Sequence, residues 1–446
     1  MKILCVSLGC DKNLVDSEMM MGLLRREGYS FTDDETEADI IVINTCAFID
    51  AAKEESINTI LELAEMKREG RCRALIVAGC MAERYKEEVL REIPEVDAIL
   101  GTNSCGEIAS VIDRVFAGEE KVTAFRDLSE AAEDSGERFV SAGGYYSFLK
   151  IAEGCNKRCT YCIIPFLRGP YRSVPIVRLL SEAKKLAEQG VKELILVAQE
   201  TTLYGVDLTG KKLLPMLLRK LSGIEGIEWI RLQYCYPEEI DDELTEAIAT
   251  LPKVLHYLDI PVQHASDRIL RRMGRKTTQA EIRQRIARIR ERIPDICLRT
   301  TLISGFPGET EEDHEELLDF VNDMEFERLG VFAYSREEGT PAAEWPDQVP
   351  DDVKEERRDE IMELQQEIAF EKAASLAGTR LDVIIEGRIP EEGLYVGRTY
   401  MDAPNVDSQI YIRSDLDLIS GTIVRAVVTD SVEYDLKGVI EDEFTE

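Results

Sequence analysis

The chain has 446 residues, more than one hydrophobic core usually organises, so two or three domains are expected. Hydrophobic residues make up 44% and charged residues 32%, which excludes an intrinsically disordered chain and a fibrous repeat. Because 54 Lys and Arg stand against 87 Asp and Glu, the formal net charge is −33; such a field repels phosphate backbones and anionic membranes and argues against a general nucleic-acid binder.

Residues 1 to about 116 alternate apolar runs with helical patterns. The apolar runs are KILCVSLG, DIIVIN, ALIVAG and AILGT, and helices are expected near 13–28 and 51–69 with a shorter one after ALIVAG. This alternation predicts a parallel sheet covered by helices. The polar, acidic stretch 119–144 follows and contains little that could form a core. We therefore predict a first domain at 1–139.

Six further apolar runs alternate with amphipathic segments beyond that stretch. They are YSFLKIA (146–152), ELILVAQ (193–199), WIRLQY (229–234), VLHYLDI (254–260), ICLRTTLIS (296–304) and RLGVFAY (328–334). Six β/α units predict a partial (β/α)6 barrel in a domain at 140–375, whose last helix is expected near 351–375. From 376 to 446, short strands separated by turn residues predict a small antiparallel β-barrel.

No run of about 18 apolar residues is present, and the first ten residues are too short and unflanked for a secretory signal. We therefore expect a cytoplasmic protein that does not engage a membrane. In a reducing compartment, the eleven cysteines favour metal ligation or catalysis over disulfides.

Three of these cysteines, Cys155, Cys159 and Cys162, form a CxxxCxxC motif directly after the first strand of the predicted barrel. Three thiolates hold three irons of a [4Fe–4S] cluster and leave the fourth iron open to another ligand. A structural zinc site is the alternative, but it needs a second CxxC pair, and the barrel region offers only the isolated Cys235 and Cys297.

A second triad is predicted from topology. Cys10, Cys46 and Cys80 are far apart in sequence, yet each follows an apolar strand of the first domain. In a parallel sheet with right-handed crossovers such strand ends meet at one edge, so the three thiols are predicted to hold a second cluster with one open iron. Three buried, incidental thiols remain the alternative, because cysteine is so often buried.

The CxxxCxxC motif resembles that of the radical S-adenosylmethionine superfamily. The resemblance implies that the amine and carboxylate of the cofactor chelate the open iron and that electron transfer cleaves its sulfonium to a 5′-deoxyadenosyl radical. Tyr161 matches the aromatic position beside the adenine, although a packed loop aromatic would look the same in sequence.

Polar residues that could contact this cofactor lie in or after the barrel strands, as expected if the site is at the C-terminal face. The predicted cofactor-binding residues are Tyr161, Gln199, Glu200, Gln263, Arg299, Gly305 and Glu309. Arg299 sits inside an apolar strand and needs an acidic partner, which either the cofactor carboxylate or an acidic side chain of the chain could supply. His264 follows Gln263 with an unassigned role, and His256 and His314 are interpreted as structural.

Nearly the whole chain resembles the methylthiotransferases, which combine an N-terminal cluster domain, a radical S-adenosylmethionine barrel and a C-terminal barrel called TRAM. The matching stretches are VSLGCDKNLVDSE, NTCAFID, KIAEGCNKRCTYCIIP, PVQHAS, LRTTLISGFPGET and FAYSREEGTPA. Within the family, His264 and the run after Cys10 resemble the group that methylthiolates the β-carbon of an aspartate in ribosomal small-subunit protein 12. Asp11 and Val174 depart from that group's usual proline and arginine.

The resemblance implies two [4Fe–4S] clusters and two S-adenosylmethionine molecules per turnover, with 3-methylthioaspartate as the product. One cofactor molecule supplies a methyl group to a sulfur at the Cys10/Cys46/Cys80 cluster; the other, reduced at the Cys155/Cys159/Cys162 cluster, yields the radical that activates the substrate C–H bond. A reductant such as flavodoxin or ferredoxin is then needed. Two alternatives are kept: a transfer-RNA adenosine methylthiotransferase, and a non-catalytic iron–sulfur factor of ribosome assembly.

Charge in the last domain bears on the choice of substrate. Residues 376–446 hold 6 Lys and Arg and 15 Asp and Glu, a net charge of −9. A barrel that grips RNA must neutralise phosphates with basic side chains, so RNA binding through this domain is disfavoured. A basic ribosomal protein, free or within the ribosome, is the better match, unless the acidic residues serve solubility alone.

Overall fold

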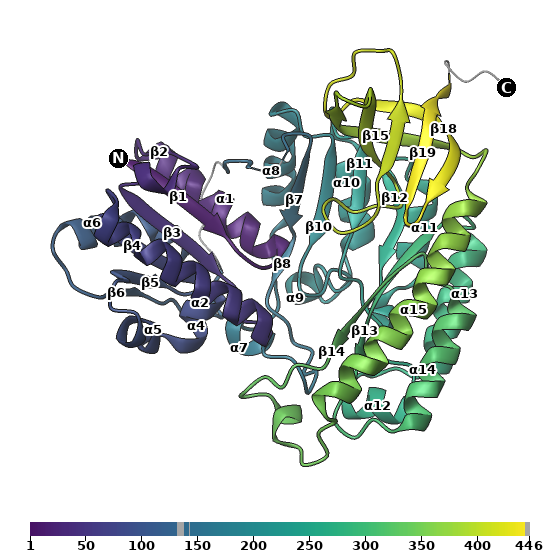
Figure 1. Cartoon of the computed structure of the whole chain (residues 1–446), viewed down its shortest axis with the longest axis horizontal. Helices are drawn as coiled ribbons and strands as arrows, with labels where there is room; N and C mark the ends of the chain where they lie inside the picture. Colours follow the sequence, from purple (N-terminus) through teal and green to yellow (C-terminus); the bar gives the residue numbers. More distant parts are fainter. Residues whose placement is uncertain (132–137, 142, 442–446) are drawn as a thin grey trace.

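The computed structural model describes residues 1–131, 138–141 and 143–441. Figure 1 shows an N-terminal α/β domain, a central barrel, and a small β-barrel seated on one end of the central barrel. Among the described residues, no helix is both long and apolar enough to cross a bilayer.

The N-terminal domain is built on a six-stranded sheet in the order β2-β1-β3-β4-β5-β6, and every neighbouring pair is parallel. The strands are β1 (Lys2–Ser7), β2 (Ser30–Phe31), β3 (Ile40–Thr45), β4 (Ala74–Gly79), β5 (Ala98–Leu100) and β6 (Val122–Ala124). The four strands expected from sequence are confirmed. The edge strands β2 and β6 were not expected, because each is only two or three residues long and lies in a polar stretch.

Helices cover both faces of this sheet. They are α1 (Asp11–Arg26), α2 (Asp50–Ala64), α3 (Met66–Glu69), α4 (Cys80–Tyr85), α5 (Glu87–Glu92) and α6 (Ile108–Phe116), with 3-10 turns η1 (Glu35–Glu37) and η2 (Cys105–Glu107). The central strands β3 and β4 are completely buried, which explains why they read as continuous apolar runs in the sequence.

The central domain has a second parallel sheet of six strands, open between its edge strands, in the order β14-β13-β12-β11-β10-β7. The strands are β7 (Tyr146–Lys150), β10 (Glu193–Val197), β11 (Trp229–Leu232), β12 (Val254–Asp259), β13 (Cys297–Ser304) and β14 (Arg328–Ala333). The predicted partial (β/α)6 barrel is therefore confirmed. A two-stranded antiparallel pair, β8 (Ala152–Glu153) and β9 (Arg172–Ser173), was not expected.

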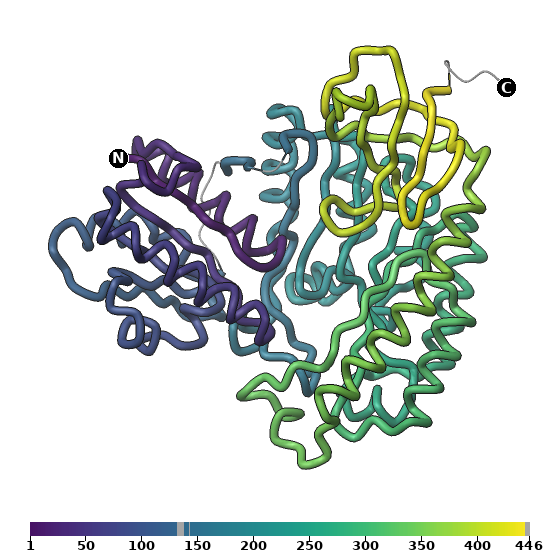
Figure 2. Tube along the Cα trace, in the orientation of Figure 1, coloured from purple at the N-terminus to yellow at the C-terminus, as the bar shows by residue number. Residues whose placement is uncertain are grey.

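The helices of the barrel alternate with its strands. They are α7 (Ile164–Arg168), α8 (Ile176–Glu188), α9 (Val206–Thr209), α10 (Leu214–Ser222), α11 (Asp242–Thr250), α12 (Asp267–Arg272), α13 (Gln279–Arg292), α14 (Glu311–Met324) and α15 (Asp351–Ser375), with 3-10 turns η3 (Pro237–Glu239) and η4 (Pro341–Glu344). The last helix, α15, matches the range predicted from sequence and leads into the C-terminal domain (Figure 2).

The C-terminal domain is a closed five-stranded barrel in the order β15-β16-β17-β19-β18. Its strands are β15 (Arg380–Ile389), β16 (Leu394–Thr399), β17 (Ile410–Arg413), β18 (Ile423–Val432) and β19 (Asp435–Ile440). The small barrel is confirmed, but β17 and β19 pair in parallel, in contrast to the fully antiparallel barrel expected. A closed ring with an odd number of strands cannot alternate direction throughout, so one parallel pair is required.

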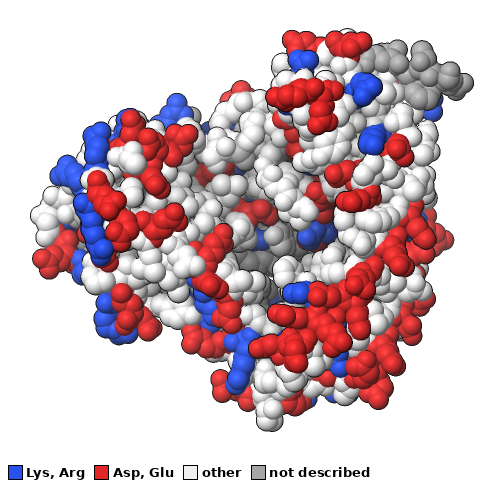
Figure 3. Space-filling view, in the orientation of Figure 1, with Lys and Arg blue, Asp and Glu red and all other residues white. Residues whose placement is uncertain are grey.

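The N-terminal domain packs against the barrel through α1 on β7 and α4 on α7. The chain enters α1 and α4 directly after β1 and β4, so these contacts turn the carboxyl edge of the first sheet toward the barrel. Figure 3 shows the surface hollowed between the two domains.

Candidate active site

The three strand-end cysteines of the N-terminal domain lie together. Cys10 caps α1 after β1, Cys46 follows β3 and Cys80 begins α4 after β4, and these three strands are consecutive in the sheet. Burial, and next the neighbouring Cys80, raise the pKa of Cys46 to about 12, with Cys10 also contributing. Gly9 (φ +85) allows the backbone before Cys10 to pass close to Cys46, since a Cβ on Gly9 would lie 2.9 Å from the Cys46 Sγ. The predicted gathering of these thiols is what the structure shows.

A cation from the barrel reaches this first triad. Arg168, at the end of α7, is 2% exposed and places its Nη2 3.5 Å from the Cys80 Sγ. Its Nη1 donates to Asp16 at 2.7 Å, and its Nη2 also contacts the Asn13 side-chain oxygen. Burial raises the pKa of Cys80, and the Arg168 charge opposes that rise. Arg168 thus favours the thiolate form that iron ligation requires.

The same arginine joins a buried network that links the two domains. Lys150 on β7 is paired with Asp16 and, at 2.6 Å, with Glu153 on β8. Glu153 also accepts from the Gln199 amide at 2.7 Å. Burial alone would raise the pKa of Glu153, but Lys150 and Arg168 hold it well below its usual range. The network runs from Cys80 to the carboxyl end of β10 and fixes one domain against the other.

The second triad occupies one loop. Cys155, Cys159 and Cys162 lie between β8 and α7, where Gly154 (φ +78) approaches the Pro170 carbonyl too closely for any side chain. Burial, opposed by a backbone hydrogen bond and supported by Cys159, raises the pKa of Cys155 to about 11. Thr160 ties the loop to the end of α12, donating from its N to the Met273 carbonyl at 3.0 Å.

Both donor sets suit iron–sulfur clusters. In the described parts of the chain, no three His, Cys, Asp or Glu side chains converge on a point that one metal ion could occupy. A tetrahedral zinc site requires such convergence, whereas a cubane takes each cysteine on a different iron and so accepts wider spacing. Thiolates also select clusters over hard cations. Each triad therefore fits a cubane better than a single ion.

Buried polar atoms without partners lie beside the second triad. Gln199 and Glu200 follow β10, and the Gln199 Oε1 and Glu200 Oε2 are buried with no hydrogen-bond partner among the described residues. The other Glu200 oxygen accepts from the Thr202 N at 3.0 Å. Burial raises the pKa of Glu200 to about 7, the Thr202 hydrogen bonds opposing it. Unsatisfied buried groups at a strand-end site fit the polar groups of a bound cofactor.

Three more predicted residues belong to the loops after β12 and β13. Gln263 has φ +72, and its backbone bonds to Thr301 and Ile303 of β13. Glu309 is buried: it accepts from the Phe306 N at 3.1 Å and from Arg357 at 3.0 Å. The oxygen that accepts from Phe306 also lies 3.3 Å from the Nε2 of His264, an atom with no hydrogen-bond partner among the described residues. These contacts stabilise the loop carrying GFPGET.

Gly305 has a packing role in the structure. Its φ is +67, and an added Cβ would lie 2.1 Å from the side chain of Lys354 and 3.0 Å from the Lys354 Cα on α15. Only glycine lets α15 lie this close to the end of β13.

Arg299 finds acidic partners inside the chain. Its Nη1 lies 3.0 Å from Asp259 on β12, and its Nε lies 3.4 Å from Asp407 of the C-terminal domain. The acidic partner that its buried position requires is therefore supplied by two aspartates, so this requirement no longer points to a cofactor carboxylate.

Tyr161 packs its ring edge-on against Phe306, with centroids 6.3 Å apart. Burial and next Cys159 raise its pKa well above the usual value. Tyr161 thus joins the cluster loop to the loop after β13.

Sequence reasoning missed several residues that touch the triads. Lys12 lies 3.2 Å over the ring of Tyr234, next to Cys10, and Tyr236 places its hydroxyl 3.7 Å from the Cys159 Sγ. Arg275 lies over the Tyr236 ring, 4.2 Å from its centroid. The tyrosines follow β11 directly, so the strand-end argument could have found them.

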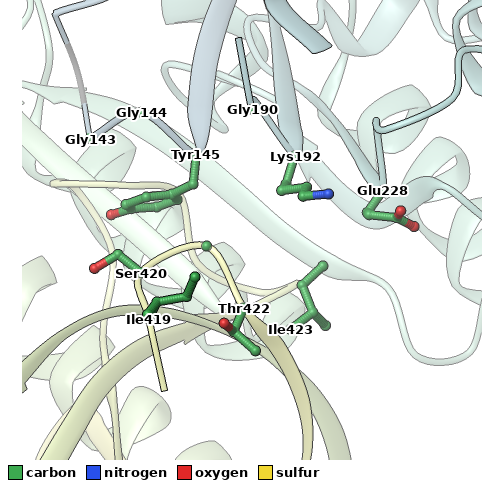
Figure 4. Close-up of a pocket in the computed structure, with 11 residues that line it drawn as sticks. Gly143, Gly144, Tyr145, Gly190, Lys192, Glu228, Ile419, Ser420, Thr422 and Ile423 are labelled. Atoms are coloured by element: carbon green, nitrogen blue, oxygen red, sulfur yellow. The ribbon is translucent and has the colours of Figure 1, made fainter. Parts of the chain in front are cut away.

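One cavity lies away from the triads. It measures about 710 Å³ and is lined by Tyr145, Lys192 and Glu228, which precede β7, β10 and β11, and by 419–423 of the C-terminal domain (Figure 4). Because β/α barrels place their chemistry at the opposite, carboxyl ends of the strands, this cavity is not the active site.

Family models match all three domains. Residues 2–101 match the Uncharacterized protein family UPF0004, residues 149–321 the Radical SAM superfamily, and residues 377–440 the TRAM domain. Among solved structures, the radical S-adenosylmethionine methyltransferase TsrM from Kitasatospora setae matches with TM-score 0.56 at 15% identity over 77% of each chain. At that identity the likeness shows a shared fold.

Several similar relatives are named Ribosomal protein uS12 methylthiotransferase RimO. The protein from Lachnoclostridium phytofermentans is 61% identical, covering 99% of this chain and 100% of that one. Those from Acetivibrio thermocellus and Geobacter sulfurreducens are 51% and 50% identical over at least 98% of both chains. With this identity along nearly its full length, with both cysteine triads and with all three domains in place, the chain belongs to the RimO family of radical S-adenosylmethionine methylthiotransferases.

Proposed function

We propose that this enzyme replaces a β-hydrogen of an aspartate in ribosomal protein uS12 by a methylthio group and that it acts in the cytoplasm. The observation that carries the proposal is the 61% identity to a relative named for uS12 methylthiolation, over nearly the full length of both chains. When bound, two [4Fe–4S] clusters and S-adenosylmethionine supply the radical, the methyl group and the site for the sulfur.

The chain's own residues position these groups. Cys10, Cys46 and Cys80 would hold the auxiliary cluster, and Cys155, Cys159 and Cys162 the cluster that binds the cofactor. The Arg168 network links the first ligand set to Glu153, two residues before Cys155, and to Gln199. Fixing both sets in one frame converts delivery of the sulfur into a step between preorganised partners.

Polar side chains at the strand ends would bind the cofactor. Tyr161 would lie beside the adenine, and Gln199 and Glu200 offer unpartnered oxygens to its donor groups. Gln263 and the loop of Gly305 and Glu309 would shape the wall, His264 holding Glu309 in place. Arg299 is already paired with Asp259 and Asp407, so it would hold β13 in place beside β12 rather than attract the cofactor.

Charge selects the macromolecular substrate. The chain carries −33 overall, and its C-terminal barrel carries an excess of acidic residues, so a basic protein is attracted and RNA is repelled. Figure 3 shows Asp and Glu gathered beside the hollow, over the side formed by α14 and α15.

Anaerobic reaction of the reconstituted enzyme with purified uS12 and with transfer RNA separates the substrates. We expect mass spectrometry to find one methylthio group on a single aspartate of uS12 and none in the digested RNA. Methylthiolated adenosine with unmodified uS12 would contradict the proposal.

A further inference from the structure

A concentrated positive charge stands out in this acidic chain. Residues 268–292, which include most of α12 and all of α13, hold 10 Lys and Arg but only 2 Glu. The next helix along the chain, α14, holds seven Asp and Glu and no Lys or Arg. The segment 268–292 is therefore strongly basic in a protein whose net charge is −33.

Carboxylates within the chain pair with six of these ten cations, among them Arg275 with Glu238. The other five ion pairs are Arg268–Asp313, Arg272–Asp347, Arg283–Asp323, Arg290–Glu327 and Arg292–Glu246. In contrast, Lys276, Arg285 and Arg288 have no ion pair or side-chain hydrogen bond with any residue that the structure describes. These three cations line a cavity of about 310 Å³ between η3 and α13.

The carboxylates in this cavity are already engaged. Glu281 accepts from the Thr278 N at 2.8 Å in the capping box of α13. Glu238 lies 3.5 Å from Lys157 and 3.6 Å from Arg275. The charge left over in the cavity is therefore positive, and its complement is an acidic group from outside the chain.

The cavity also lies next to the barrel cluster loop. Pro237, in its wall, directly follows Tyr236, whose hydroxyl is 3.7 Å from the Cys159 Sγ. Lys276 directly follows Arg275, which stacks on the same tyrosine. A Cβ on Gly274 would lie 3.0 Å from the Arg158 carbonyl, so the two loops are in contact. One side chain, Tyr236, therefore separates the cavity wall from a cluster ligand.

We propose that the basic surface of Lys276, Arg285 and Arg288 is the docking site for an acidic one-electron carrier protein, of the flavodoxin class, that reduces the barrel cluster. The inference rests on the proposed function, since reductive cleavage of S-adenosylmethionine consumes one electron. That electron leaves the reduced carrier and enters the cluster, and no bond forms or breaks at the surface. A basic ribosomal protein would be repelled here, which leaves the substrate hollow free while the carrier docks.

The test compares two reductants on the anaerobic holoenzyme. In R285E/R288E, we expect half-maximal 5′-deoxyadenosine formation to require a concentration of reduced flavodoxin on the order of tenfold higher than in wild type. We also expect this required concentration to depend less on salt. Dithionite, which needs no docking surface, should drive cleavage at the wild-type rate. The control K184E/K437E makes the same change in net charge on exposed lysines of α8 and β19 and should behave as wild type.

Each outcome decides the proposal. The proposal is overturned if R285E/R288E needs no more flavodoxin than wild type, or if K184E/K437E shows an equal rise in the flavodoxin needed. It is also overturned if R285E/R288E loses affinity for ribosomal RNA while its flavodoxin-driven cleavage stays intact. If dithionite-driven cleavage also falls in R285E/R288E, the substitutions have damaged the fold. The test is then repeated with R285A/R288A, for which we expect a smaller rise in the flavodoxin concentration needed for half-maximal cleavage. Wild type that forms no 5′-deoxyadenosine with dithionite would instead count against the proposed function itself.

Discussion

Cys10, Cys46 and Cys80 come from the ends of three neighbouring strands, whereas Cys155, Cys159 and Cys162 share a single loop. The first set depends on the packing of a whole sheet and on Arg168, a cation that another domain supplies. The second set depends on a turn at Gly154 and on hydrogen bonds to the end of α12. Long-range packing should therefore govern the first cluster, and local loop geometry the second.

The largest expected effect comes from removing one triad at a time. The variant C155A/C159A/C162A should form no 5′-deoxyadenosine under strict anaerobiosis, because no open iron remains for the cofactor in the barrel. Iron analysis should still find about four irons per chain, held by the first triad. Continued cofactor cleavage would refute the assignment, and loss of all iron would remove the role given to Cys10, Cys46 and Cys80.

The next effect concerns the contact between domains. Arg168→Met leaves Asp16 and Glu153 with less compensation in a buried space, and breaking such pairs costs about 3–5 kcal/mol. We expect a lower Tm in thermal unfolding and loss of iron from the first triad before the second. Arg172→Met is the control, because Arg172 bonds the carbonyls of Arg168 and Pro170. Equal Tm values for the two variants would show that the network does not stabilise the interface.

The cysteines of both sites could be predicted from the sequence, but several of the residues around them could not. The loop triad is a spacing in the sequence, and the strand-end triad follows from parallel topology, so both could be predicted. The partners of Arg299 could not be predicted. Asp407 lies 108 residues further along the chain, in the C-terminal domain, and it meets Arg299 only once the chain has folded. Arg168 reaching Cys80 is hidden for the same reason, and short edge strands such as β6 carry too few residues to show a period.

A smaller effect is expected from Gly9→Ala. An alanine at φ +85 costs about 1–2 kcal/mol of backbone strain, and its Cβ would stand 2.5 Å from the Cys46 Cβ. Iron bound by the first triad should fall while 5′-deoxyadenosine formation persists. Gly28→Ala is matched in strain, at φ +87, but meets no atom within 4 Å among the described residues. Identical iron content in the two variants would contradict the close approach at Cys46.

A further effect is a dependence of stability on pH. Burial raises the pKa of Glu200 to about 7, so the folded state favours the neutral acid more than the unfolded chain does. The contribution is complete below the unfolded pKa of about 4.3 and is lost as pH rises through about 7, at up to about 1.4 kcal/mol per pH unit. In metal-free, reduced protein, the fall in Tm between about pH 5 and 8 should be shallower for E200Q. If the curves of Tm against pH run parallel for wild type and E200Q, Glu200 is less desolvated in the folded protein than this account requires.

The most direct test of the central claim, that two cysteine triads each leave one iron open, is Mössbauer spectroscopy of the 57Fe-loaded, anaerobic holoenzyme. We predict two [4Fe–4S] clusters per chain, with S-adenosylmethionine changing the signal of one iron in one cluster, and that change surviving in C10A/C46A/C80A. A single cubane in the wild type, or a cofactor response that disappears in C10A/C46A/C80A, would contradict the account.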